Sequence, residues 1–261
     1  MPARERAGTE RTGGKHMTGT AGTAVTTAAA LHEQRRLDWD GCLNVRDLGG
    51  LPTRDGRHTR TGAVVRADNL DRLTAEGQNS LLDYGVRTVV DLRDAVEYRP
   101  LLPAPDAVDL VRVPLDALAG SAWWARFGGL DGTPLSFRPY LDHCRDAVAE
   151  LVHAVAVARP GAVVVHCGAG RDRTGLAALL LLALAGVEPA AIAEDYLLSA
   201  ANLRPLWTIL DRPDEEAGIA RVLAAAGTTA EQAVHQVLAE FDAPDWLPAD
   251  DVAAVRARLL T

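Results

Sequence analysis

The chain has 261 residues and a formal net charge of −8, with 35 acidic side chains against 27 basic ones. This balance argues against an electrostatic grip on nucleic acid or on an anionic membrane surface. Lys15 is the only lysine, so arginine supplies nearly all of the positive charge. An arginine by itself is therefore weak evidence for a phosphate site, and the signal must come from spacing.

Cysteine usage and hydropathy indicate the compartment. Cys42, Cys144 and Cys167 are an odd number without a CxxC pair, which argues against a disulfide framework and a zinc site. The N-terminus lacks the apolar core of a signal peptide, and the longest apolar run, residues 176–187, is shorter than the ~20 residues that span a bilayer. We therefore expect a soluble, unexported protein of the reducing cytoplasm.

The pattern along the chain predicts one α/β domain. Residues 1–30 lack an apolar period, so we predict a disordered tail before a single domain over 31–261. Strands alternating with helices favour a central, mostly parallel sheet flanked by helices, with sites at the carboxyl ends of strands. The expected strands cover 63–66, 86–91, 109–113 and 163–165, and the expected helices cover 75–84, 137–155, 176–187, 189–199, 231–241 and 250–260.

Some of these elements carry a more specific expectation. Thr74 is placed to cap the helix over 75–84, and Thr228 with Glu231 forms a capping-box pattern before the helix over 231–241. Cys144 lies on the apolar stripe of the helix over 137–155, as a buried structural thiol would. Residues 115–139 read as a loop, and the aromatic cluster at Trp123 and Trp124 suits either a lid or packed core.

The segment from residue 161 to 175 is the strongest feature of the chain. A β-branched strand over 163–165 precedes it and an apolar helix follows, so it forms a strand-to-helix loop. Gly168, Gly170 and Gly175 allow a tight turn that brings backbone N–H groups and the helix N-terminus to one point. Cys167 opens the loop and Arg173 closes it, so a thiol and a planar cation converge on one anion.

This loop has the parts for phosphoryl transfer. Cys167 is placed to attack phosphorus and form a phosphocysteine, while Arg173 binds two oxygens of the phosphoryl group. Thr174 is placed to hydrogen-bond the sulfur, and His166 orients the loop through backbone contacts. The phosphate-binding residues are then Gly168, Ala169, Gly170, Arg171, Asp172 and Arg173.

The leaving group also needs a proton, so a carboxylic acid must stand near the ester oxygen. Asp172 lies inside the loop, Asp91 ends a neighbouring strand, and Asp116 follows the next strand. The sequence does not rank these three candidates.

Other functions for a glycine-rich loop of this kind fit the sequence less well. A dinucleotide site is disfavoured because the cysteine precedes the glycines, and a Walker-type site because no Gly-Lys-Ser/Thr is present. A non-catalytic phosphate-binding module is disfavoured by the intact Cys167, Arg173 and Thr174. Sulfur or arsenate chemistry on a thiolate loop generally needs a resolving thiol, and neither Cys42 nor Cys144 is near Cys167 in the sequence.

At His166, Cys167, Arg173 and Thr174 the sequence resembles the cysteine-dependent protein tyrosine phosphatases, whose signature is His-Cys-x5-Arg-Ser/Thr. More narrowly, the segments 44–50 and 166–175 resemble the atypical bacterial tyrosine phosphatases. That resemblance implies a phosphatase fold with extra C-terminal helices. It also implies hydrolysis of phosphomonoesters without a metal or other cofactor.

The resemblance assigns further roles. It makes Asp172 a contender for the general acid, and it adds Asn44, Arg46 and Asp47 as supporting residues. Arg171 stands where that subfamily usually has lysine. The expected partner is a phosphorylated substrate, and phosphotyrosine in a protein, an inositide and a small metabolite ester all remain open.

Overall fold

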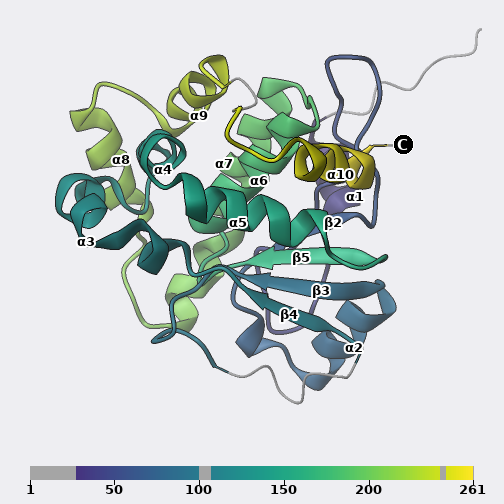
Figure 1. The fold of residues 1–261 in the computed structure, drawn as a ribbon. Helices are drawn as coiled ribbons and strands as arrows, with labels where there is room; N and C mark the ends of the chain where they lie inside the picture. Colours follow the sequence, from purple (N-terminus) through teal and green to yellow (C-terminus); the bar gives the residue numbers. More distant parts are fainter. Residues whose placement is uncertain (1–27, 100–106, 242–244, 261) are drawn as a thin grey trace, which may run out of the picture.

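The computed structural model describes residues 28–99, 107–241 and 245–260 (Figure 1). The tail predicted for residues 1–30 lies outside this part of the chain except at its end. There the prediction is wrong, because helix α1 (Ala28–Arg35) already begins at Ala28. No helix among the described residues combines the length and apolarity needed to cross a membrane.

The described residues form one five-stranded sheet in the order β1-β2-β5-β3-β4. β1 runs antiparallel to β2, and the other neighbouring pairs are parallel. This confirms the predicted α/β class with a mostly parallel sheet. The strands are β1 (Arg46–Asp47), β2 (Val64–Ala67), β3 (Val86–Asp91), β4 (Asp109–Arg112) and β5 (Ala162–His166).

Helices cover both faces of the sheet, and β5 shows how its residues divide between them. Val163 and Val165 pack into the larger core, whereas Val164 packs on the opposite side. In Figure 1, α5 (Arg145–Ala156), α6 (Arg173–Leu184) and α10 (Ala249–Leu259) lie over one face, and α2 (Ala75–Asp83) lies under the other. A strand that is buried on both faces is apolar at successive positions, which is why residues 163–165 read as a β-branched run.

Five further α-helices and three short 3₁₀ helices make up the rest of the described helical structure. They are α3 (Leu115–Phe127), α4 (Phe137–His143), α7 (Pro189–Ile209), α8 (Glu216–Ala225) and α9 (Ala230–Ala239), with short 3₁₀ helices η1 (Leu70–Arg72), η2 (Gly128–Leu130) and η3 (Pro134–Ser136).

Thr74 caps α2 as predicted, since its hydroxyl accepts a hydrogen bond from the Gly77 N–H at 3.2 Å. The capping box of α9 is displaced by one residue from the prediction. Thr229 and Gln232 form it, because the helix begins at Ala230. Two adjacent threonines satisfy the pattern equally well in the sequence, so only the backbone distinguishes them.

The region over 115–139 is not a loop, which corrects that prediction. It begins with α3, kinked at Gly120, where φ is +77°. The Trp123 ring is 4% exposed and lies 4.3 Å from the Tyr140 ring, centroid to centroid. Of the two readings of the aromatic cluster, packed core is therefore the right one for Trp123.

Two other helix boundaries differ from the prediction. The helix expected over 137–155 is interrupted at Cys144, whose ψ of 45° is not helical, although its side chain is buried as expected. The apolar stripe continues across this break, so periodicity alone cannot detect it. α7 continues past Pro205 to Ile209, and α8 was not predicted.

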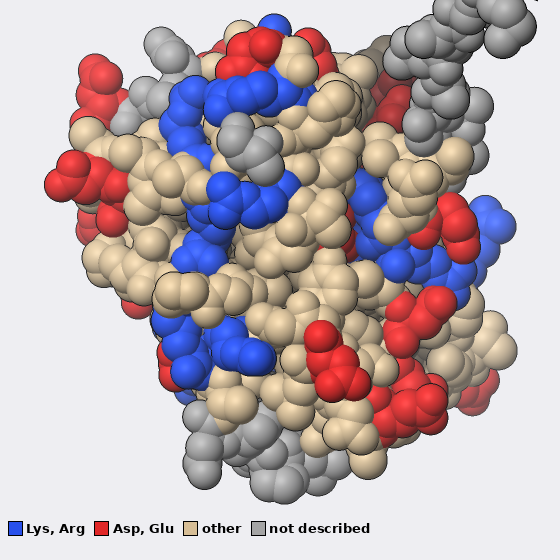
Figure 2. All heavy atoms as spheres, turned by 90° about the vertical axis from the view of Figure 1, so that its right-hand side faces the viewer, with Lys and Arg blue, Asp and Glu red and all other residues tan. Residues whose placement is uncertain are grey.

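Charges of both signs reach the surface. Figure 2 shows a band of basic side chains along one side of its face, with acidic groups beside it and uncharged surface between them.

Candidate active site

The loop between β5 and α6 begins at the carboxyl edge of the sheet, as the sequence predicts. Cys167 is 3% exposed, and its sulfur accepts the Gly170 N–H at 3.3 Å. Gly170 has φ +69°, and a Cβ built there would lie 2.4 Å from the Ala67 carbonyl oxygen. Any side chain at this position would clash with the end of β2, so the close approach requires glycine.

Groups outside the loop hold its carbonyl oxygens. The Asn44 amide donates to the Ala169 and Gly170 carbonyls, both at 3.1 Å. The Arg66 guanidinium donates to the Gly170 carbonyl at 2.7 Å, and the Asn69 N–H donates to the Gly168 carbonyl at 3.0 Å. These bonds from outside hold the loop backbone in one conformation, in which the Gly170 N–H faces the Cys167 sulfur.

The buried carboxylate of Asp195 holds this support in place. It accepts from Arg35 at 2.7 Å, Arg46 at 3.0 Å and Arg66 at 2.6 Å, and all four side chains are almost fully buried. Burial alone would raise the pKa of Asp195, but Arg46, Arg66 and Arg35 outweigh it and hold that pKa well below its usual range. Arg46 also donates to Asn44 at 2.6 Å, so the network reaches the loop directly.

Asp47, unlike Asn44 and Arg46, makes its contacts away from the loop that carries Cys167. Its carboxylate accepts the Gly49 N–H at 2.7 Å, the Gly62 N–H at 2.6 Å and the Tyr84 hydroxyl. These contacts fix the connection between β1 and β2, and they support the active-site loop only indirectly.

Arg173 lies among carboxylates. Its two terminal nitrogens bind the Glu97 carboxylate at 2.6 and 2.8 Å, and one of them lies 3.1 Å from Asp116. This is the fork geometry in which an arginine binds two oxygens of one anion. Glu97 therefore occupies the place that the sequence assigns to a phosphate. Nothing in the sequence distinguishes Glu97 from other exposed carboxylates, and the prediction missed it.

The three candidate acids have different surroundings. Asp91 is 1% exposed and pairs with Arg93 at 2.8 Å. Burial alone would raise the pKa of Asp91. Hydrogen bonds from Arg93, together with the electrostatic effect of His166, outweigh burial and lower that pKa. Asp172 caps α6 without a side-chain cap bond and lies 3.4 Å from both Arg171 and the Tyr196 hydroxyl.

Both carboxylate oxygens of Asp116 have polar partners. One oxygen accepts the Tyr140 hydroxyl at 2.7 Å, and the other lies 3.1 Å from Arg173. Burial raises the pKa of Asp116 above its ordinary value, although Arg173 opposes the shift. The Trp124 indole donates to the Asp116 carbonyl at 2.9 Å, which fixes the backbone that carries the acid.

The remaining loop side chains are placed as follows. Arg171 is turned toward α8, where it pairs with Glu216 at 2.7 Å and Glu215 at 3.4 Å. The Thr174 hydroxyl is buried and has no hydrogen-bond partner among the described residues, so the predicted bond to the sulfur is not formed in this structure. His166 contacts the Cys167 carbonyl at 3.3 Å, and burial lowers its pKa to about 4.

Asp94, Glu97 and Asp116 could bring three carboxylate oxygens within 4.8 Å of one another. Glu97 and Asp116 are both ion-paired with Arg173. The arginine already pairs with two of the three carboxylates, so their closeness has an explanation without a cation.

A mostly parallel sheet that carries this cysteine loop at its carboxyl edge is the architecture of the cysteine-dependent phosphatases. The model of the tyrosine phosphatase family matches residues 37–261, and the chain belongs to that family.

Curated relatives agree with this assignment. A tyrosine-protein phosphatase of Nostoc commune is 35% identical over 147 residues, which cover 54% of this chain and 49% of the relative. The triple specificity protein phosphatase PtpB of Mycobacterium tuberculosis is 28% identical over 61% of this chain and 67% of the relative. A relative from Cupriavidus necator, provisionally named a tyrosine-protein phosphatase, is 31% identical over 66% of each chain. The chain thus spans between about half and two thirds of the length of these relatives.

Proposed function

We propose that this protein hydrolyses phosphomonoesters, with phosphotyrosine as its substrate group and Cys167 as its nucleophile. The observation that supports the proposal is the loop itself. The Cys167 sulfur accepts the Gly170 N–H at 3.3 Å, and, against the effect of burial, the charge of Cys167 contributes to raising the pKa of Arg173, so the two side chains lie near one another. The names of the relatives support the choice of phosphotyrosine.

In the first step the Cys167 thiolate attacks phosphorus. A sulfur–phosphorus bond forms while the bond between phosphorus and the ester oxygen breaks, and the electron pair leaves on that oxygen. Arg173 releases Glu97 and binds two phosphoryl oxygens in the same fork geometry. The loop amides and Arg173 then stabilise the charge that develops on those oxygens.

Asp116 is the proton donor that the geometry favours. It lies beside Arg173, and its raised pKa keeps more of it protonated than an ordinary aspartate. Asp91 is less suited, because hydrogen bonds from Arg93 outweigh burial and lower its pKa, whereas burial raises that of Asp116. Asp172 remains the second candidate, since it lies in the loop itself.

In the second step water attacks phosphorus, the sulfur leaves as thiolate, and inorganic phosphate is released. The carboxylate left on Asp116 is placed to take the proton from that water. Thr174 is positioned beside the loop to donate a hydrogen bond to the departing sulfur, and its unpartnered hydroxyl is free to do so within the described structure. No step in this scheme needs a metal or another cofactor.

The test is phosphate release from a panel of substrates in the presence of a chelator. The panel holds phosphotyrosine peptides, phosphoserine peptides, inositides, sugar phosphates and nucleotides. We expect the highest kcat/KM on phosphotyrosine peptides and no loss of rate with the chelator. A higher kcat/KM on a small metabolite ester would replace the proposed substrate class, and a chelator-sensitive rate would contradict the cysteine mechanism.

A further inference from the structure

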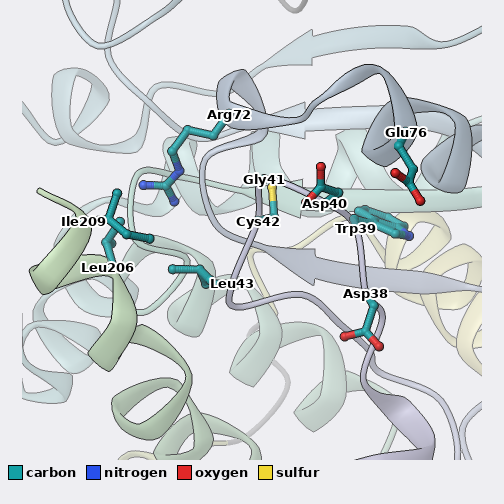
Figure 3. Close-up of a pocket in the computed structure, with 10 residues that line it drawn as sticks. All are labelled: Asp38, Trp39, Asp40, Gly41, Cys42, Leu43, Arg72, Glu76, Leu206 and Ile209. Atoms are coloured by element: carbon teal, nitrogen blue, oxygen red, sulfur yellow. The ribbon is translucent and has the colours of Figure 1, made fainter.

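A hollow outside the candidate active site lies on the α2 side of the molecule, with a volume of about 700 Å³ (Figure 3). Its walls come from the segment before β1, from the start of α2 and from the end of α7. We call it the acidic hollow. It is lined by Asp38, Trp39, Asp40, Gly41, Cys42, Leu43, Arg72, Glu76, Leu206 and Ile209.

The acidic hollow has an apolar side and a charged side. Figure 3 shows Leu206 and Ile209 of α7 on one side, with the Arg72 guanidinium beside them, and Asp40 with Glu76 on the other. Ile209 is 67% exposed, so it offers an aliphatic contact surface at this end of the hollow. An occupant that spans the hollow would meet an aliphatic contact at one end and carboxylates at the other.

The charge of the acidic hollow is negative. Arg72 is its only basic lining residue among the described ones, and the buried Asp68 already neutralises it at 2.5 Å. Glu76 makes no hydrogen bond or ion pair with any described residue. The Asp38 side chain is 82% exposed and pairs at 2.9 Å with Arg36, which does not line the hollow. The hollow is therefore complementary to a segment that carries Lys or Arg beside an aliphatic side chain.

One wall residue of the hollow, Leu43, also packs in one apolar cluster with the loop that carries Cys167. Leu43 packs with Ala169 of the loop against Leu203, Leu206 and Trp207. Leu43 and the next residue, Asn44, both donate their backbone N–H to Asp68, and Asn44 holds two loop carbonyls. The hollow and the loop therefore meet at Leu43 and its neighbour Asn44.

We propose that the acidic hollow docks a basic, aliphatic segment of the phosphoprotein substrate, at a distance along the chain from the phosphorylated residue. This inference rests on the proposed function, because it names the kind of phosphoprotein that the same active site takes.

The first experiment measures binding without catalysis. Two labelled peptides of equal length and without phosphate, one alternating lysine with leucine and one alternating glutamate with leucine, are titrated with the full chain by fluorescence anisotropy. We expect the lysine peptide to bind at least roughly tenfold more tightly and to weaken as salt rises. Asp38→Asn combined with Glu76→Gln should weaken it roughly three- to tenfold. Ile209→Ser should also weaken it.

The control is Glu231→Gln, which removes a carboxylate that is also exposed but lies on α9 and does not line the hollow. It should leave the binding of the lysine peptide unchanged. Equal binding of the two peptides, or equal losses in the control and in the paired variant, would overturn the docking site.

The second experiment links the hollow to catalysis. The lysine and glutamate elements are joined at several distances to one phosphotyrosine sequence, and kcat/KM is measured for each. We expect the lysine series to be preferred at one range of spacing, with the preference lost in the paired variant. Equal rates at all spacings would overturn the docking role alone. No phosphate release from either series would overturn the proposed function and, with it, the docking of a phosphoprotein substrate.

Sedimentation tests whether a second copy of this chain occupies the hollow instead. A molecular mass that rises with concentration in the wild type, and that is lower in Ile209→Ser, would assign the hollow to a second copy and overturn the docking of a substrate.

Discussion

Replacing Asp195 by asparagine tests the support of the catalytic loop. The carboxylate of Asp195 is bound by Arg35, Arg46 and Arg66 at 2.6 to 3.0 Å, with side chains exposed by 5% or less. Asparagine keeps the shape and one acceptor oxygen, but it leaves three buried positive charges without their counter-charge. Arg66 would then repel Arg46 while it still has to hold the Gly170 carbonyl.

Removing one partner from a buried ion pair costs about 3–5 kcal/mol. For a chain of this size that loss lowers the melting temperature by roughly 6–20 °C. Since the pKa of Asp195 is lowered in the folded protein, its contribution is present above the unfolded pKa of ~3.9 and is lost as the pH falls below that value. The difference in the free energy of unfolding between the wild type and Asp195→Asn should therefore be largest at pH 7 and decrease in acid.

Urea unfolding followed by circular dichroism at pH 7 and at low pH measures both effects. Ser199→Ala is the milder companion, because it removes one acceptor of Arg46 at 3.1 Å and leaves the carboxylate in place, at a cost of about 1 kcal/mol. If Asp195→Asn lost less than Ser199→Ala, or if its loss grew as the pH fell, the buried carboxylate would not be what holds the arginines.

Three other changes test the site. Asp116→Asn should lower kcat by about 10²–10⁴-fold on phosphotyrosine and remove the fall in rate as pH rises, since the acid must be protonated; an unchanged basic limb in the pH–rate profile would point to another acid. Glu97→Gln should tighten inhibition by inorganic phosphate, because that anion competes with Glu97 for Arg173, and weaker inhibition would mean that Glu97 positions the arginine. Gly170→Ala should abolish phosphate binding, measured by calorimetry, because its Cβ would lie 2.4 Å from the Ala67 carbonyl; binding at the original affinity would contradict the required close approach.

The sequence predicts β2 to β5 and the loop between β5 and α6 because their signals are local. The β-branched residues 163–165 lie in β5, and Thr74 caps α2, since each depends on neighbours within a few positions. The class of sheet follows from the alternation of such elements. The break at Cys144 is also a local event, but the apolar period runs through it unchanged, so the pattern gave one helix where the protein has two.

The contacts that complete the site come from distant positions. Glu97 lies 76 residues from Arg173 in the sequence, and Tyr140 lies 24 from Asp116. Neither pairing has a spacing rule, because a loop can bring any exposed carboxylate to a cation. The aromatic residues of 115–139 read as a loop because several glycines lie among and after them, and the structure instead places Trp123 in the core, where its ring contacts Tyr140.

The central claim is that a phosphoryl group passes through the Cys167 sulfur. The most direct test is mass spectrometry of the full chain, quenched in acid during turnover of a phosphotyrosine peptide and digested. We predict one added phosphoryl group on the peptide that contains Cys167, and neither that group nor phosphate release in Cys167→Ser. Phosphate release at the wild-type rate in Cys167→Ser, with no adduct in the wild type, would contradict the claim.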